Sequence, residues 1–138
     1  MKLLLHTCCA PCLIYPLERL RDQGFAPTAY YYNPNIHPFA EYRLRMQAAE
    51  GLAGEMEAKF VCPEYRPQEF LRAVCGSESG VARCLVCWNL RMARTAEFAR
   101  ENGFDYFSTT LLVSPYQDQD ALKKIGQDVS LKAGVKFY

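Results

Sequence analysis

The sequence lacks a long hydrophobic run, a strong excess of charge, internal repeats and any low-complexity tail. No stretch approaches the roughly 20 apolar residues that span a bilayer, so we expect no membrane partner. The formal net charge is only +1, and bulk charge therefore argues neither for nor against a nucleic-acid partner. The segment Met1–His6 is too short for a signal peptide. We expect it to be the first strand of a cytoplasmic protein.

Cysteine, in contrast, is abundant and clustered. The chain of 138 residues holds seven cysteines, an odd number in a chain large enough not to need disulfides, which disfavours a disulfide framework. Three of them lie in the run Cys8-Cys9-Ala10-Pro11-Cys12, directly after the apolar segment Leu3–Leu5. A second pair, Cys84-x-x-Cys87, follows later. Because thiolates bind soft metals, the two clusters predict a metal or redox site.

Strand-like and helix-like segments alternate along the chain. We predict strands at residues 2–7, 27–32, 57–61, 106–110 and 135–138, and helices at 13–23, 39–52, 67–74, 87–102 and 120–132, with 75–83 as a loop. This alternation predicts a single α/β domain whose parallel sheet has helices on both faces. Ligands of such sheets bind beyond the carboxyl ends of the strands. Cys8–Cys12 and Ser108–Thr110 fall at such ends.

The residues alone leave the metal open. A Cys-x-x-Cys pair is typical of half a zinc site, a redox pair or half an iron–sulfur site. Neighbouring thiols such as Cys8 and Cys9 seldom converge on one small tetrahedral ion, and we therefore favour an iron–sulfur cluster over zinc. The alternative is that the thiols are small core hydrophobes. A helix beginning near Cys12 or Leu13 would lower the pKa of a nearby thiolate through its dipole.

Three arginines flank the second cysteine pair. Arg91 follows Cys87 by four residues, so that both project toward the same end of the predicted helix. Together with Arg83 and Arg94 it forms either a solvated helix face or a rim that binds phosphates of an RNA. We retain both interpretations.

Other single residues are weaker candidates. His6 lies in the first strand and is expected to be a hydrogen-bonded core residue, whereas His37 lies in a loop where it can contact a substrate. Glu64 follows the third predicted strand and is either an ordinary loop residue or part of the rim of the site. Cys62 and Cys75 stand alone, and we expect both to be structural or incidental thiols.

The pattern of these residues resembles the QueH family of epoxyqueuosine reductases. The resemblance covers essentially the whole chain and is carried by Leu4–Cys12, Tyr31–Pro38, Glu41-Tyr42, Arg83–Trp88, Arg91, Gly103–Leu111, Ser114-Pro115-Tyr116 and Ile125-Gly126. It implies an adenine-nucleotide hydrolase-like, Rossmann-like fold. Cysteines stand where such folds carry a glycine-rich phosphate loop, which argues against the use of ATP.

The resemblance implies a cobalamin-independent oxidoreductase of queuosine biosynthesis. Such an enzyme reduces epoxyqueuosine, at the wobble position of a tRNA, to queuosine in the last step, with electrons from a donor that the sequence does not identify. By the same resemblance Glu64 is a candidate metal ligand or proton donor. Arg83, Arg91 and His37 are candidate substrate contacts.

The resemblance also implies a ligand set. Cys8, Cys9, Cys84 and Cys87 match the cysteines that hold the family's 4Fe-4S cluster. Cys12 is a fifth candidate: it is a ligand of the cluster, a ligand of a second iron or zinc ion, or a residue that merely lines the pocket.

Two alternatives from other classes stay open. One is a non-catalytic zinc-binding RNA module, and the other is a thiol–disulfide oxidoreductase that uses Cys84 and Cys87. Family members usually continue with a Cys-x-Cys pair, whereas this sequence ends at Phe137-Tyr138. We therefore expect residues 1–138 to form one α/β iron–sulfur domain without the family's C-terminal segment. The sequence leaves the oligomeric state open.

Overall fold

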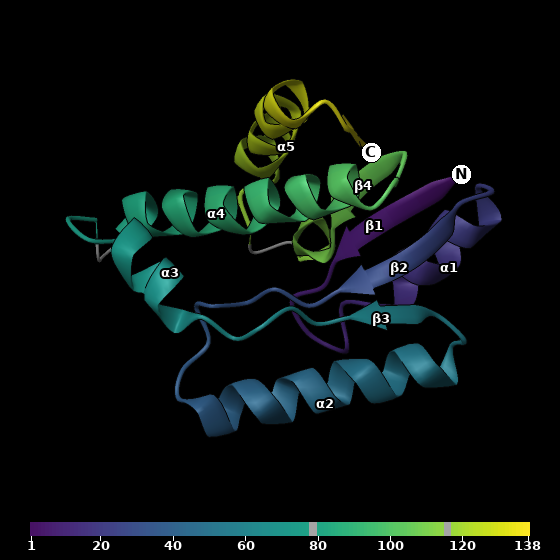
Figure 1. The fold of residues 1–138 in the computed structure, drawn as a ribbon, viewed down its shortest axis with the longest axis horizontal. Coiled ribbons are helices and arrows are strands. Elements are labelled where there is room, and N and C mark those ends of the chain that lie inside the picture. Colours follow the sequence, from purple (N-terminus) through teal and green to yellow (C-terminus); the bar gives the residue numbers. More distant parts are fainter. Residues whose placement is uncertain (78–79, 115–116) are drawn as a thin grey trace.

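The computed structural model describes residues 1–77, 80–114 and 117–138 and contains one parallel sheet in the order β3-β2-β1-β4-β5 (Figure 1). The strands are β1 (Lys2–His6), β2 (Ala26–Tyr30), β3 (Lys59–Val61), β4 (Tyr106–Thr109) and β5 (Lys136–Phe137). The helices are α1 (Ile14–Asp22), α2 (Phe39–Glu55), α3 (Pro67–Ala73), α4 (Gly80–Glu101) and α5 (Gln119–Ala133), with a 3₁₀ turn, η1, at Thr110–Val113.

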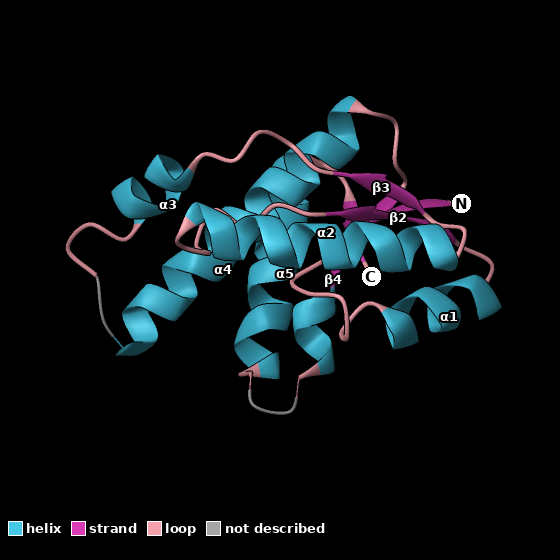
Figure 2. Ribbon diagram, turned by 90° about the horizontal axis from the view of Figure 1, so that it is seen from below, coloured by secondary structure: helices cyan, strands magenta, loops and turns pink. Residues whose placement is uncertain are grey.

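Helices cover both faces of the sheet, as predicted. Side chains alternate along β1, so Leu3 and Leu5 face one side and Leu4 faces the other. Leu3 and Leu5 pack with residues of α1 and α2, whereas Leu4 packs with α4 and α5. Figures 1 and 2 show these two layers, with α2 across the sheet from α4. The expected α/β, Rossmann-like architecture is confirmed.

The order of the strands reverses beside β1. From β1 the chain continues to β2 and β3 on one side of the sheet, and then returns to place β4 and β5 on the other. His6, the last residue of β1, is paired with Tyr30 of β2 and with Thr109 of β4. A crevice opens at such a switch point beyond the strand ends, and it is the usual ligand site of doubly wound sheets.

The α4 helix begins earlier than we predicted. It starts at Gly80, so residues 80–83 are helical. The prediction that the loop 75–83 extends to residue 83 is therefore wrong for its last four residues. Gly80 has a φ of 68°, a conformation that glycine adopts readily, and the chain therefore turns directly into the helix. Cys84 consequently lies inside α4. Glu78 and Ser79 of the predicted loop lie outside the described residues, as do Pro115 and Tyr116.

The last strand lies close to α5. Phe137 of β5 packs beside Gly126 of α5 so tightly that a Cβ atom at Gly126 would lie 2.5 Å from the ring. The α5 helix ends at Ala133. The next residue, Gly134, caps the helix in a left-handed conformation with a φ of 75°. None of the helices within the described ranges is both long and apolar enough to cross a bilayer.

Candidate metal centre

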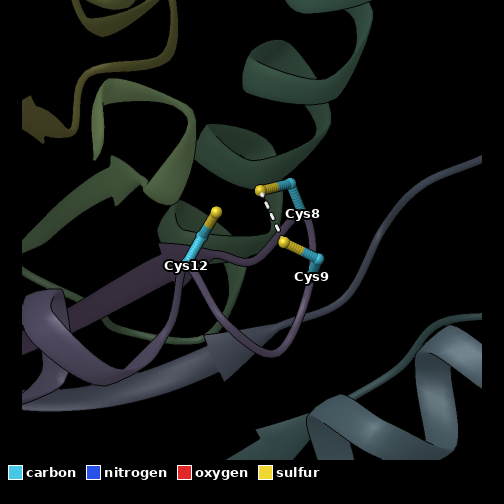
Figure 3. Close-up of side chains that lie close together, drawn as sticks. All are labelled: Cys8, Cys9 and Cys12. Carbon is cyan, nitrogen blue, oxygen red and sulfur yellow. Dashed lines mark hydrogen bonds between the residues drawn. The ribbon is translucent and has the colours of Figure 1, made fainter. Parts of the chain in front are cut away.

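Three thiols converge in the loop between β1 and α1. The Sγ atoms of Cys8, Cys9 and Cys12 all lie within 4.8 Å of one another, and those of Cys8 and Cys9 are 3.8 Å apart (Figure 3). A tetrahedral zinc site with Zn–S bonds of about 2.3 Å has S···S separations of about 3.8 Å. These three thiols therefore fit a thiophilic metal, and Cys8 and Cys9 converge although neighbouring thiols seldom do.

Backbone and amide hydrogen bonds fix the start of this loop. The N–H of Thr7 donates to the carbonyl of Tyr30 (2.9 Å), which continues the β1–β2 ladder past His6. The carbonyl of Thr7 accepts from Nδ2 of Asn33 (2.9 Å). The N–H of Leu13 then closes a turn onto the carbonyl of Ala10 (3.0 Å). The turn brings Cys12 back beside Cys8 and Cys9.

Thr110, just beyond β4, contacts Cys8 twice. Its hydroxyl accepts a hydrogen bond from the N–H of Cys8 (3.0 Å) and donates one to Cys8 Sγ (3.2 Å). The threonine is fully buried. The sequence placed Thr110 at the carboxyl end of a strand, but its bond to Cys8 depends on β4 lying beside β1, and no local pattern encodes that neighbourhood.

A raised pKa keeps the thiols of Cys8 and Cys12 protonated in the metal-free protein. Burial raises the pKa of Cys8, against the opposing effect of the bond from Thr110. Burial and then the neighbouring Cys9 and Cys8 thiols raise the pKa of Cys12 to about 12. The predicted lowering of a nearby thiolate's pKa by a helix dipole is therefore wrong for Cys8 and Cys12, because burial raises the pKa of both. A metal that binds here must displace protons.

His6, two residues before Cys8, bonds to the residues that follow β2 and end β4. Its Nε2 lies 3.1 Å from the carbonyl oxygen of Tyr32, which can only accept, and its Nδ1 lies 2.9 Å from the hydroxyl of Thr109. Nε2 therefore carries a proton, and the Thr109 hydroxyl can donate to Nδ1 of a neutral ring. Burial, and next the positive charge of Arg91, lower its pKa to about 3. The expectation of a hydrogen-bonded core histidine is confirmed.

The second cysteine pair lies on α4, apart from the triad. Cys87 is buried against Phe70 of α3 and against Val74, which follows this helix, and Cys84 is exposed. Both line a cavity of about 700 Å³ at the carboxyl-end side of the sheet, together with Asn35, Phe70, Arg83, Trp88 and Arg91. Within the described ranges, the one group of three or more metal-ligating side chains that converge is Cys8, Cys9 and Cys12. The structure thus shows a triad and a separate pair.

The three arginines of α4 do not form one face. Arg91 is 6% exposed and donates from Nη1 to Oδ1 of Asn33 (3.2 Å), so a solvated helix face is wrong for this residue. Arg94 is paired with Glu69 at 2.8 Å. Arg83 lies at the entrance of the cavity, with its guanidinium 5.5 Å from the centre of the Phe70 ring.

The other predicted site residues lie at different distances from the cysteines. His37 is exposed, with its ring 5.8 Å from that of Phe70, and so it lies near the cavity that holds Cys84 and Cys87. Glu64 is exposed and paired with Arg66 at 3.0 Å, and it lines a different pocket, with Tyr32 and Arg94. Phe70 was not predicted as a site residue, because a single apolar residue on a short helix resembles any core position.

The chain matches one protein-family model and a group of curated relatives. Residues 3–138 match the model described as epoxyqueuosine reductase QueH. A protein of that name from Dehalococcoides mccartyi is 38% identical over 99% of this chain and 74% of its own length. Relatives of the same name from Streptococcus pyogenes and Thermotoga maritima are 40% and 35% identical, and the matches cover 56% and 71% of their lengths.

A solved structure shares the fold at low sequence identity. It is described as a predicted subunit of tRNA methyltransferase from Methanocaldococcus jannaschii, and it superposes with a TM-score of 0.69 over all of this chain and 68% of that chain. The sequence identity is 10%. This likeness supports the α/β architecture and nothing finer.

Proposed function

Since this chain belongs to the QueH family, we propose that it is an epoxyqueuosine reductase that acts on tRNA. The carrying observation is the Cys8, Cys9 and Cys12 triad at the switch point between β1 and β4, where α/β sheets bind their ligands. Because the proposed substrate is a tRNA, we propose that the reaction takes place in the cytoplasm.

The proposed reaction is a two-electron reduction. Both C–O bonds of the epoxide break, a carbon–carbon double bond forms, and two protons and two electrons convert the oxygen to water. The electrons come from a one-electron or two-electron donor protein or an equivalent chemical reductant. Since the curated relatives are longer than the matched segments, the activity of this chain alone is part of the proposal.

We assign the cofactor to the three thiols of the triad and the two thiols of the α4 pair. Cys8, Cys9, Cys84 and Cys87 are the proposed ligands of a 4Fe-4S cluster, and Cys12, as a member of the triad, is the proposed ligand of a second iron or zinc ion. The donor set supports this assignment, because thiolates prefer iron–sulfur clusters and zinc. When bound, such a group supplies electrons and a Lewis acid for the epoxide oxygen.

The surrounding side chains would hold the modified nucleoside. Phe70 provides an aromatic ring beside the cavity, and nucleobases stack on such rings. Arg83 and His37, which both lie beside that ring, are the proposed contacts to the nucleotide. Glu64 is the proposed proton donor. This role requires its ion pair with Arg66 to open, and the Glu64 side chain is 74% exposed in that pair.

The thiol–disulfide alternative has less support. A redox-active thiol needs a lowered pKa and an accessible sulfur. Burial raises the pKa of Cys87, with Arg91 opposing this effect, and the side chain is 7% exposed. Cys87 is therefore a poor nucleophile in the metal-free protein.

Anaerobic reconstitution with iron and sulfide, followed by incubation with reductant and tRNA that carries epoxyqueuosine, tests the proposal. We expect the modified nucleoside to lose the mass of one oxygen atom. The metal-free protein and a Cys8→Ser variant should leave the epoxide intact, whereas Cys75→Ser, an exposed cysteine outside the triad, should keep the activity. An unchanged epoxide with a fully loaded cluster would refute reductase activity in this chain.

A further inference from the structure

Arg91 is a buried cation that forms no ion pair with any carboxylate in the part of the chain that the structure describes. Its side chain is 6% exposed, and Nη1 donates to the neutral Oδ1 of Asn33 (3.2 Å). Its Nε is buried and has no hydrogen-bond partner. Among the described residues, the ion pairs are those of Arg45, Arg66 and Arg94, and no carboxylate pairs with Arg91. A buried charge is costly unless an opposite charge and hydrogen bonds compensate it.

The position of Arg91 indicates where the missing anion belongs. Cys87 precedes it by one helical turn, on the same face of α4. The positive charge of Arg91 acts on Cys87 and also on His6, at the end of β1. Asn33, which accepts from Arg91, donates to the carbonyl of Thr7, the residue before Cys8. Arg91 therefore lies between the α4 pair and the end of β1 that carries the triad.

We infer that Arg91 is the counter-cation of the metal–thiolate group, which places it among the positioning residues of the site rather than among contacts to tRNA phosphate. The inference rests on the proposed function, since it takes the thiols of Cys8, Cys9, Cys84 and Cys87 as ligands. Thiolates around a metal carry net negative charge, and reduction adds one further negative charge. A fixed cation beside them stabilises the bound group and stabilises its reduced state more than its oxidised state.

The inference predicts a lower reduction potential when the charge is removed. In an Arg91→Gln variant, the equilibrium constant for reduction of the bound cluster should fall at least tenfold, which is about 59 mV for a one-electron couple. Arg91→Lys keeps the positive charge and loses the planar guanidinium group. Its equilibrium constant for cluster reduction should differ from that of the wild type by less than threefold. Arg100→Gln, the same charge change at an exposed position near the far end of α4, should leave the constant unchanged.

The experiment is a redox titration of the reconstituted full chain, followed by visible absorption. A potential equal to that of the wild type in folded Arg91→Gln would overturn the inference. If that variant does not fold, Arg91→Lys decides, because a tenfold loss with the charge retained would show that shape rather than charge matters.

A second measurement separates this inference from the proposed cofactor. If the wild-type chain forms no iron–sulfur cluster, the cofactor proposal fails, and the role of Arg91 is then read from the binding of Co²⁺ to the thiols. Arg91→Gln should bind Co²⁺ at least tenfold more weakly than the wild type. The Co²⁺ affinity of Arg91→Lys should differ from that of the wild type by less than threefold. Equal affinities in wild type and Arg91→Gln would overturn the inference.

Discussion

The hydroxyl of Thr110 is bonded to both the N–H and the Sγ of Cys8, at 3.0 and 3.2 Å. One side chain beyond β4 thus fixes both the backbone and the thiol of the first cysteine beyond β1. Because the hydroxyl has one proton, its acceptance from the N–H leaves that proton for the sulfur. A donor of this kind stabilises a metal-bound thiolate from outside the ligand set.

Replacement of Thr110 by valine removes both bonds at nearly constant shape. The buried N–H of Cys8 then has no acceptor, which should destabilise the metal-free protein by about 1–3 kcal/mol. The free energy of unfolding from urea titration measures this cost. Metal affinity should also fall, by roughly 10–100-fold as for other residues that support ligands.

Thr110→Ser is the matched control for this change. It keeps the hydroxyl, and should retain most of the affinity of the wild type. Equal metal binding by the valine and wild-type proteins would show that the bond to Cys8 Sγ has no role in ligation.

Substitution of single cysteines distinguishes the two metals that we propose. Cys12→Ser should keep the visible absorption of the cluster and lose the second metal ion, because Cys12 is the triad member that we propose for the second ion and not for the cluster. Cys84→Ser should lose the cluster absorption. Elemental analysis together with the absorption spectrum of anaerobically reconstituted protein measures both.

Cys75→Ser controls for the loss of a thiol as such, because Cys75 is exposed and lies outside the triad. Loss of all cluster absorption in Cys12→Ser would instead make Cys12 a cluster ligand. A wild-type protein that binds no iron or zinc beyond the four irons of the cluster would refute the second ion.

The fold was predictable because its signals are local. The alternation of strand and helix segments predicts a parallel, helix-covered sheet, and Leu3–Leu5 has the apolar character of a buried strand. The position of the triad was predictable for the same reason, since it follows a strand. What the sequence could not predict is which strand ends become neighbours, and hence the bond from Thr110 to Cys8.

The limits of prediction are clearest at Arg91. Its spacing from Cys87 correctly indicates a shared helix face, but spacing carries no information on whether that face is exposed. In the folded chain Cys87 packs against Phe70 and Val74, and Arg91 is bonded to Asn33 and 6% exposed. An arginine assigned to an RNA-binding rim is therefore an interior charge.

The contact between Gly126 and Phe137 tests the packing of the last strand. Alanine at an exposed or neutral helix position stabilises by about 1 kcal/mol relative to glycine. At Gly126 a Cβ would lie 2.5 Å from the Phe137 ring, and such overpacking costs about 1–3 kcal/mol. We therefore expect Gly126→Ala to lower the free energy of unfolding, measured with urea.

Two variants give this prediction its controls. Gly51→Ala in α2 meets no atom within 4 Å and should raise stability. In a Phe137→Ala background, Gly126→Ala should also become stabilising, because the ring is gone. A stabilising effect of Gly126→Ala with Phe137 present would show that the ring moves aside at little cost.

The buried His6 makes the stability of the metal-free protein depend on pH. Burial and Arg91 lower its pKa to about 3, whereas histidine in an unfolded chain has a pKa of about 6.5. Between these values the unfolded state binds one more proton at this residue than the folded state. The free energy of unfolding should therefore decrease as the pH falls from 6.5 toward 3.

The slope of this decrease separates His6 from the carboxylates. One proton difference is worth up to about 1.4 kcal/mol per pH unit, and His6→Gln should reduce the slope near pH 5 by that order. Nitrogen NMR of the wild type should show a neutral ring with the proton on Nε2 at pH 5, because Nε2 donates to Tyr32 and Nδ1 accepts from Thr109. A charged ring at pH 5 in the folded protein, or an unchanged slope in His6→Gln, would contradict the neutral buried histidine.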